Sequence, residues 1–425
     1  MDFSTSTDVL AAVLQRLPPC ARRRARLVCK LWRETVDERT TEMHSRAKVL
    51  LWNTRTAVAY VVVDDTSSSP TGSCRELWSG GRPPMYSQWD AELQLVGTCN
   101  GLLCVCDNGG STGGEVALVN PVTSEALPLP PLPCGDQLAG DRRSCRWDKA
   151  YSFAYHPTSG RYKVVHVPCT FERAYDFDAV QVLTVEKEAT WREVPTPGGA
   201  RCNLKAGVVS VDGTTYWVTK GGAARVVSLS LDDDERVAGF ALPSPALSAG
   251  PDNYHLAEVR GRLGVLVHDP FASTTGVWVR GEKGRWTRRC GLWSQDPTRP
   301  HFVHGEQVTT FQGSSLRGHR RKGTRLLSSP CDVTVSDKDH GTLLAKVKGG
   351  ARHYRTFAYV ETTEPLGAYG GKPPSMASVT QQRLLGGLQA PWAVFVLLFA
   401  FFVLMLAVSV ARLYKLDALP SQVLL

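Results

Sequence analysis

Glycine and histidine residues give the chain its first candidates for nucleotide or metal chemistry. Gly109 to Gly114 form a glycine-rich run, but the Lys-Ser/Thr pair that completes a nucleotide-binding loop is missing. His301 and His304 have no further Cys or His at the spacing of a metal site. We therefore predict a hairpin tip for the glycine run and a loop for the two histidines.

Cysteines and one pair of aspartates complete the search for reactive groups. The chain holds 12 cysteines, but residues 1–5 lack the basic start and apolar run of a secretory signal, which favours reduced thiols in the cytosol. Cys104 and Cys106 lack the two-residue gap typical of zinc ligands. Asp64 and Asp65 stand beside turn residues at the end of a predicted strand. The sequence thus predicts no catalytic residue, no metal and no cofactor.

Length and composition favour a turn-rich β protein with small appendages. The chain has 425 residues with 38 glycines and 26 prolines, and charged residues make up 21% of it. Its formal net charge of +9 is local, because basic residues cluster at 22–26 and 317–325. No aromatic-rich surface or known nucleic-acid module accompanies these clusters. We interpret them as solvated surface and expect no nucleic-acid partner.

Apolar residues near the N-terminus follow helical spacing. Residues 9, 10, 13, 14 and 17 are apolar and share one face of a helix. A cap among residues 5–7 is expected to begin this helix, and Pro18 and Pro19 to end it. A second helical pattern runs from 21 to 38 with a break near Cys29. The prediction is a helical domain of roughly forty residues, which needs a partner or a neighbour because so small a core is marginal.

From Lys48 the apolar period changes to two, which predicts strands. The predicted strands include 57–63, 115–119, 162–167, 180–185 and 226–231. Gly213 and Gly261 occupy similar strand–turn–strand segments, 48 residues apart, and Trp191 and Trp286 lie 95 residues apart. Repeats near this length are typical of propeller blades. The pattern weakens between 292 and 343, which we predict to be loop, and the number of blades stays open.

The C-terminal part contains a linker and one long apolar segment. Gly, Pro and Ser enrichment after Pro365 predicts a linker. Residues 391–411 carry no charge over 21 positions, and a helix of this length spans roughly 30 Å, the thickness of a bilayer core. The expected membrane-spanning positions include Trp392, Phe395, Leu398, Phe401, Leu404 and Leu406. The alternatives are a lipid-anchor signal and a buried soluble helix, which would have to hide apolar side chains on every face.

Residues 7–18 and 24–33 resemble an F-box. They present Asp8, paired apolar residues, Arg16-Leu17-Pro18, an Arg-rich segment and Val28-Cys29-Lys30 before Trp32. The resemblance implies a module that docks on the Skp adaptor of a cullin-based ubiquitin ligase. The matching adaptor-binding positions are Asp8, Leu10, Leu14, Leu17, Pro18, Val28 and Trp32. The alternative is that these residues only pack a helical hairpin. Two departures from the family pattern are Thr5-Ser6, where Leu-Pro is frequent, and Arg22, where an apolar residue is common.

Residues 97–104 and 119–130 are similar to the start of plant F-box-associated domains, and weaker matches continue to about 360. The resemblance implies a propeller-like β domain that binds the protein to be ubiquitylated. We interpret Asn120-Pro121 as a structural turn, because Asn bonds its own backbone there and Pro fixes φ. Tyr216, Trp217 and the blade tryptophans are expected in the core between blades.

The sequence therefore predicts an α+β protein in five parts. These are an F-box at 5–47, an F-box-associated β-propeller-like domain at 48–365, a linker at 366–390, a transmembrane helix at 391–411 and a short tail at 412–425. The expected function is that of a non-enzymatic receptor subunit that recruits an unknown target protein to the Skp adaptor and cullin. Its C-terminus would enter a lipid bilayer, with the F-box and β domain in the cytosol. The alternative is a membrane-associated propeller scaffold without ligase coupling.

Overall fold

The computed structural model describes most of the chain between residues 3 and 370. The described residues are 3–17, 21–22, 25, 28–39, 48–63, 73–80, 91–109, 112–133, 146–168, 177–221, 224–232, 235–259, 261–272, 274–293, 301–304, 307–313, 323–330, 342–348 and 353–370. The expected transmembrane segment at 391–411 lies outside them. Within the described part of the chain, no helix combines the length and apolar character needed to cross a bilayer.

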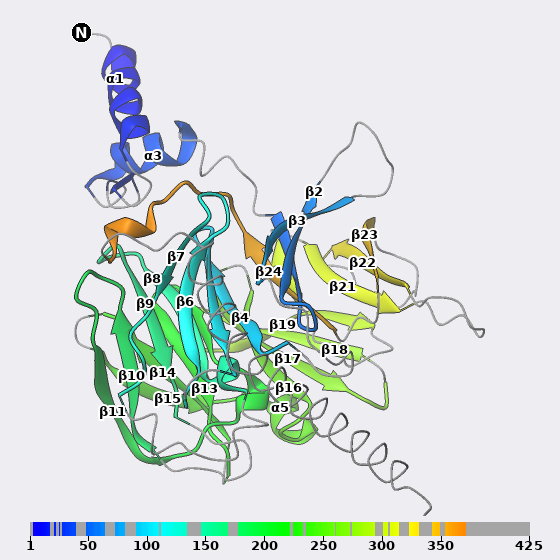
Figure 1. Cartoon of the computed structure of the whole chain (residues 1–425). Coiled ribbons are helices and arrows are strands. Elements are labelled where there is room, and N and C mark those ends of the chain that lie inside the picture. The colour runs from blue at the N-terminus through cyan, green and yellow to red at the C-terminus, as the bar shows by residue number, and fades with distance from the viewer. Residues whose placement is uncertain are drawn as a thin grey trace, which may run out of the picture. The chain divides into compact units, whose positions relative to one another are not determined.

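Helices α1 and α3 belong to the described part of the N-terminal module, in which residues 21, 22 and 25 are helical as well (Figure 1). Helix α1 spans Phe3–Arg16, and α3 spans Lys30–Arg39 after a break at residues 28–29. The break near Cys29 is confirmed. The predicted cap at 5–7 is wrong, because α1 begins at Phe3 and these residues lie inside the helix. Ser and Thr are strongly preferred at N-caps, but they cost under about 0.7 kcal/mol inside a helix, so residue type alone does not fix the first turn.

A core of three side chains holds this module together. Leu14, Ala25 and Val36 are buried, and Leu10, Leu17 and Trp32 pack against them. Arg22, the departure from the apolar pattern, is also buried, and its Nη1 donates to the carbonyl oxygen of Gln15 at 3.4 Å. The guanidinium thereby finds a backbone acceptor on α1.

Six four-stranded antiparallel sheets, named here blades 1–6, make up the described β domain. Strands are given from the innermost outward. Blade 1 is β24 (Tyr354–Tyr359), β1 (Lys48–Asn53), β2 (Val58–Val63) and β3 (Ser73–Ser79). Blade 2 is β4 (Leu93–Cys99), β5 (Leu102–Asp107), β6 (Glu115–Asn120) and β7 (Glu125–Pro128). Blade 3 is β8 (Tyr151–His156), β9 (Arg161–His166), β10 (Phe177–Thr184) and β11 (Trp191–Ala200).

The remaining blades follow in chain order. Blade 4 is β12 (Val209–Val211), β13 (Thr214–Val218), β14 (Arg225–Ser230) and β15 (Val237–Ala241). Blade 5 is β16 (Tyr254–Val259), β17 (Arg262–Asp269), β18 (Thr274–Arg280) and β19 (Trp286–Trp293). Blade 6 is β20 (His301–His304), β21 (Gln307–Gly313), β22 (Gly323–Pro330) and β23 (Thr342–Lys348). The short helices are η2 (Trp147–Ala150), η3 (Leu204–Ala206), α5 (Ser244–Ala249) and η5 (Leu366–Ala368).

The chain closes these sheets into a ring. The late strand β24 is the innermost strand of blade 1, and it pairs antiparallel with β1 from Lys48↔Tyr359 to Asn53↔Tyr354 (Figure 1). The innermost strands contact one another in the order β24, β4, β8, β12, β16, β20 and back to β24. This is the arrangement of a β-propeller, in which radial repetition leaves only short outer edges.

Hydrophobic cores lie between neighbouring blades. Trp217 is fully buried beside Val182 in the core shared by blades 3 and 4, while Trp191 and Trp286 pack against the cores of blades 2–3 and 4–5. The predicted role of the tryptophans in the core between blades is confirmed. The interface between two neighbouring blades, and not one central core, is therefore the packing unit.

The predicted repeat follows this blade structure. Gly213 and Gly261 lie in equivalent turns between the first and second strands of blades 4 and 5, with φ of 71° and 68°. A positive φ favours glycine because a Cβ is strained there. Trp191 and Trp286 each begin the outermost strand of their blades, two blades apart. The five predicted strands overlap β2, β6, β9, β10 and β14.

The prediction of a loop between 292 and 343 is wrong, because this stretch carries most of blade 6. His301 and His304 are the ends of β20, not loop residues. Strand β21 is the polar sequence QVTTFQG, and β22 contains two serines, so alternation of apolar residues is weak there. β-branched Thr and Val and pairing within the sheet outweigh the missing alternation.

The two ends of the blades differ in what they carry. One end, named here the turn end, holds the tight turns at Gly101, Gly213 and Gly261, and there β1 begins at Lys48 and β24 ends at Tyr359. The other end, named here the crossover end, holds the connections between successive blades. Both chain connections therefore leave the propeller at the turn end.

A strap at residues 360–370 follows β24 along blade 2. Asn120 Nδ2 donates to the carbonyl oxygen of Glu364 at 2.8 Å, and Leu366 N donates to Glu125 Oε2 at 2.7 Å. The buried carboxylate of Glu364 accepts from the hydroxyls of Tyr162 and Tyr369. Leu366 and Tyr369 belong to the core of blades 2 and 3. The predicted linker start at 366 is thus too early, because apolar packing continues beyond the last strand.

Asn120 confirms the expectation of a structural turn. Its Oδ1 accepts from Val122 N at 2.9 Å and from Thr123 N at 3.3 Å, while its Nδ2 holds the strap. The side chain is fully buried, so each of these groups depends on it.

Replacement of Asn120 by Ala is expected to lower the free energy of unfolding by about 1–3 kcal/mol, because the carbonyl oxygen of buried Glu364 and the backbone N–H groups of Val122 and Thr123 each lose a hydrogen bond to this buried side chain. Urea unfolding followed by tryptophan fluorescence measures the change. Thr123→Ala, which removes only an exposed hydrogen bond to Glu125, serves as the control and should stay within about 0.5 kcal/mol of wild type. Equal effects of the two variants would contradict the assigned role of Asn120.

Candidate functional site

The helical module exposes large apolar side chains. Val9, Val13, Val28 and Leu31 are between 48% and 62% exposed. Val9 and Val13 lie one turn apart on α1, while Val28 and Leu31 flank the start of α3. Several large apolar side chains left exposed on so small a module are typical of protein-binding surfaces.

The predicted adaptor-binding residues divide into three groups. Leu14 is fully buried, and Leu10, Leu17 and Trp32 pack half-buried on the same core. Asp8 and Val28 are exposed, and Pro18 lies outside the described residues. Their role in adaptor binding stays a prediction.

Three exposed residues of this surface were not predicted as binding residues. Leu31 was not singled out, and Val9 and Val13 were assigned only to the apolar face of the helix. The signal was present in the pairs 9–10 and 13–14, because two adjacent apolar positions make a stripe wider than one neighbouring helix covers.

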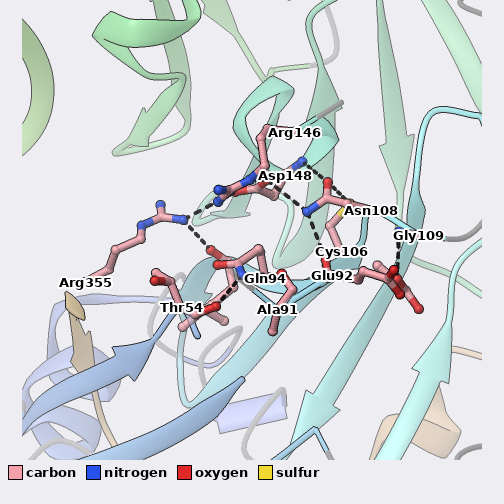
Figure 2. A network of polar contacts seen from close by, with 12 residues as sticks. Thr54, Ala91, Glu92, Gln94, Cys106, Asn108, Gly109, Arg146, Asp148 and Arg355 are labelled. Carbon is pink, nitrogen blue, oxygen red and sulfur yellow. Dashed lines mark hydrogen bonds and ion pairs between the residues drawn. The ribbon is translucent and has the colours of Figure 1, made fainter. Parts of the chain in front are cut away.

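A second candidate site is a polar network at the crossover end of blades 1–3 (Figure 2). Its centre is Asp148 in η2, whose side chain is fully buried. Arg146 Nε donates to Asp148 Oδ1 at 2.9 Å, and Asn108 Nδ2 donates to the same oxygen at 3.1 Å. In return, the backbone N–H of Asp148 donates to Asn108 Oδ1 at 3.1 Å. These bonds fix η2 against the connection that follows β5.

Strand β24 adds a second arginine to this network. Arg355 Nη1 lies 3.6 Å from Asp148 Oδ2 and donates to the carbonyl oxygen of Leu95 at 2.9 Å. Its guanidinium carbon stands 5.2 Å from the centre of the Phe357 ring, within reach of a cation–π contact. Blades 1, 2 and 3 therefore meet at one carboxylate.

Gln94 joins blades 1 and 2 beside the network. Its Nε2 donates to the carbonyl oxygens of Thr54 and Ala91, at 2.9 and 2.7 Å, and its Oε1 accepts from Trp52 Nε1 at 3.3 Å. The amide is fully buried and uses both its donor and acceptor sides, and Figure 2 shows the donor side with Thr54 and Ala91. These hydrogen bonds thus join the end of β1 in blade 1 to the start of β4 in blade 2.

Electrostatics keep Asp148 ionised. Burial by itself would raise the pKa of its carboxyl, but the charge and hydrogen bond of Arg146, with the charges of Arg355 and Lys149, hold the pKa below its ordinary value. The side chains of Arg146 and Arg355 are 26% and 25% exposed. Two arginines that reach solvent thus share one buried carboxylate.

The other candidates from the sequence are structural where the structure describes them. Gly109, Gly113 and Gly114 lie in the hairpin connection between β5 and β6, as predicted. Cys104 and Cys106 are buried in β5, and burial raises the pKa of both thiols, which disfavours the reactive thiolate. Asp64 and Asp65 lie outside the described residues. Among those that are described, no group of three or more His, Cys, Asp or Glu side chains is placed to hold a metal ion.

Fold and surfaces define a class of protein: a closed β-propeller with a small N-terminal helical module that exposes apolar side chains. Comparison with protein families narrows this class. Residues 6–41 match the F-box domain, and residues 67–310, more than half of the chain, match the F-box associated beta propeller domain. The chain belongs to the F-box proteins that carry this propeller domain. Proteins of this family are non-catalytic substrate adaptors of ubiquitin ligases, and an F-box implies binding to the Skp adaptor and cullin.

Individual relatives are distant. "F-box protein At3g07870" of Arabidopsis thaliana is 22% identical over 68% of this chain and 72% of its own length. "F-box/LRR-repeat protein At2g43260" of the same plant is 26% identical over 54% of this chain and 53% of its own length. This chain therefore spans only about half of the second relative. A solved structure, apo AztD from Citrobacter koseri, is similar with a TM-score of 0.35 and 9% identity over 76% of this chain and 100% of that chain.

Replacement of Asp148 by Asn is expected to lower the free energy of unfolding at pH 7 by about 2–3 kcal/mol, less than for a fully buried ion pair because both arginines reach solvent. The folded-state pKa of Asp148 is depressed, so its stabilising effect is present above the unfolded pKa of about 3.9 and is lost as pH falls through the folded pKa.

The difference between wild type and Asp148→Asn in urea unfolding should therefore be full at pH 7 and shrink below about pH 4. Glu282→Gln, which alters a surface ion pair with Arg262, is the control and should change little at either pH. A difference that grows on acidification would show that Asp148 is not stabilised as the charged form.

Proposed function

We propose that this chain is the substrate-recognition subunit of a Skp-cullin-F-box ubiquitin ligase, which recruits a target protein through its propeller. The observation that carries the proposal is the exposed apolar surface of the helical module, attached to a propeller that needs no partner to bury its own cores. The helical module leaves apolar side chains exposed for a partner to cover. The propeller buries its own cores and offers its outer surface for target binding.

Adaptor binding is supported by the balance between buried and exposed apolar residues in the module. Leu14 and its neighbours order the two helices, and Val9, Val13, Val28 and Leu31 remain for a partner. Burial of such side chains contributes roughly 1.5–3 kcal/mol each. A few of them suffice for the central anchor of an interface.

Target binding is assigned to the crossover end of the propeller. The turn end receives both chain connections and the strap over blade 2, as described above. The crossover end carries the longer connections between blades, where binding residues usually lie on a rigid scaffold.

A membrane tether is the second part of the proposal. Residues 391–411 are supported as a transmembrane helix by sequence alone: they are uncharged, long enough to span a bilayer core, and followed by Arg412 and Lys415. The F-box must face the cytosol to meet its adaptor, which sets the orientation. The proposal is a receptor held at an intracellular membrane.

The adaptor surface is tested by co-purification of the full chain with the Skp adaptor and cullin. Val9→Glu/Val13→Glu should abolish binding, because two charges replace exposed apolar contacts, while the melting temperature of the protein stays near that of wild type. Gln15→Glu, at another exposed position of α1, is the control and should bind normally.

Leu14→Ala should also lose adaptor binding, but through a different cause. It removes a fully buried side chain at a cost of about 2–5 kcal/mol, which the small module cannot sustain. No adaptor binding by the wild-type chain would leave a tethered propeller scaffold without ligase coupling as the better account. Unchanged binding by the double glutamate variant would move the interface elsewhere.

The tether is tested by extraction of membranes with sodium carbonate. The full chain should stay in the pellet, because a spanning helix resists removal of peripheral contacts. A variant without residues 391–411 should pass to the soluble fraction. Release of the full chain by carbonate or high salt would reject the tether and leave the ligase proposal intact.

A further inference from the structure

Blade 5 carries an excess of positive charge (Figure 1). Between Tyr254 and Trp293 the sequence has seven Lys or Arg and three Asp or Glu, a surplus of four positive charges. The three acids keep to their own surroundings: Glu282 pairs with Arg262 at 2.9 Å, Asp269 accepts from backbone N–H groups of its turn, and Glu258 is largely buried. The basic residues of the outer hairpin, β18 and β19, therefore outnumber the acids close to them.

Four of these basic residues are exposed and form no ion pair with another described residue. They lie in the β18–β19 turn and on β19, and are Lys283, Arg285, Arg288 and Arg289. Since β19 is the outermost strand of its blade, these side chains lie on the outer side of the ring and not in a core. Unbalanced positive charge of this kind attracts an anionic surface within about one Debye length, roughly 10 Å.

The hairpin that presents these charges is held against blade 4. Trp286 Nε1 donates to the carbonyl oxygen of Ala241 at 2.9 Å, and the guanidinium carbon of Arg280 stands 3.4 Å from the centre of the Phe240 ring. Arg280 is thus engaged inside the protein and does not belong to the exposed set. The exposed basic residues follow it on a fixed strand.

The same blade exposes a large apolar side chain. Phe271 is 100% exposed in the turn between β17 and β18, where Asp269 Oδ1 accepts from Phe271 N at 2.9 Å and from Ala272 N at 3.1 Å. Leu247, 52% exposed, lies on α5, which contacts β17. Among the described residues of the propeller, Val122 at the turn end of blade 2 is the one other large apolar residue that is exposed.

An anionic membrane surface fits both features of blade 5. Each Lys or Arg close to acidic headgroups strengthens binding roughly fivefold, and burial of apolar side chains at the level of the headgroups adds to it. A single-stranded nucleic acid would instead stack its bases on exposed aromatic rings beside the charges. Trp286, the aromatic residue next to Arg285, is half-buried and its N–H is already bonded.

We propose that the outer hairpin of blade 5 and the Phe271 turn form a membrane-contact surface. Lys283, Arg285, Arg288 and Arg289 attract the anionic headgroups of a bilayer, and Phe271 enters the headgroup layer. The inference deepens the membrane part of the proposed function and rests on that location, because it names a second contact with the same bilayer. Blades 1–3 stay free at the crossover end for a target protein.

The test follows hydrogen–deuterium exchange of the full chain, reconstituted into vesicles of phosphatidylcholine alone or with about 30% phosphatidylserine, which makes the surface anionic. In the anionic vesicles the backbone amides of 269–272 and 281–289 should exchange several-fold more slowly than in the neutral vesicles. The amides of β15, the outermost strand of blade 4, should exchange alike in both.

Variants at exposed positions separate specific contact from net charge. Arg285→Glu/Arg289→Glu should abolish the protection of 281–289, whereas Arg285→Lys/Arg289→Lys should keep it, since attraction to a surface follows charge. Lys187→Glu/Lys220→Glu changes the net charge equally at exposed lysines of blades 3 and 4 and should keep the protection. All three double variants should melt near the wild-type temperature.

The apolar contact has its own pair of variants. Phe271→Ser should remove the protection of 269–272, because its side chain is the part that enters the headgroup layer. Val122→Ser changes an exposed apolar side chain at the turn end of blade 2 and should leave that protection intact. Equal effects of the two variants would overturn the role of Phe271.

Equal exchange in neutral and anionic vesicles would overturn the proposal, and so would loss of protection in the lysine control. Protection of the same amides by oligouridine, with none from anionic vesicles, would assign the surface to a nucleic acid and overturn the lipid assignment. Failure of the tether is separate. Release of the full chain by carbonate, with protection retained in the presence of anionic vesicles, would reject the tether and leave the blade 5 surface standing.

Discussion

Pairing between β24 and β1 is the contact on which the β domain depends. Without β24, blade 1 has no innermost strand, and the contacts from β20 to β24 and from β24 to β4 that close the ring are lost. The pairing joins residues about three hundred positions apart, so its formation brings a large loop-closure cost that the neighbouring blades must offset. The strap, which follows the C-terminal end of β24, packs Glu364, Leu366 and Tyr369 against blades 2 and 3. It thereby anchors that end of the closing strand.

Ring closure also completes the polar network around Asp148. Arg355 belongs to the closing strand, while Asp148 and Asn108 come from connections of blades 2 and 3. The guanidinium reaches Asp148 only when β24 lies in register on β1 and beside β4. The strand that closes the ring is thus also the strand that completes the polar network, and an opening of blade 1 would remove the contacts of Arg355 with Asp148 and Leu95.

The sequence predicted the elements with strong periodicity and missed those without it. Gly213 and Gly261, with apolar runs on each side, indicated equivalent turns, and the structure places both at the same position of their blades. Blade 6 was missed because QVTTFQG offers little apolar alternation, and its strands form through pairing with neighbours. Asp148 was not singled out, since one aspartate beside an arginine carries no spacing signal. Its partner Arg355 lies more than two hundred residues away, and only the fold brings them together.

The helical module and the propeller obey different constraints on their apolar residues. In the propeller, large side chains such as Trp217 are buried between blades, and loops can change without exposing them. In the described part of the module, Leu14, Ala25 and Val36 are buried, Leu10, Leu17 and Trp32 pack half-buried against them, and Val9 and Val13 are exposed. Leu14 therefore contributes to the stability of the module, while Val9 and Val13 on the same helix stay exposed. A substitution at Leu14 disturbs the core of the module, whereas a substitution at Val9 or Val13 changes only an exposed apolar position.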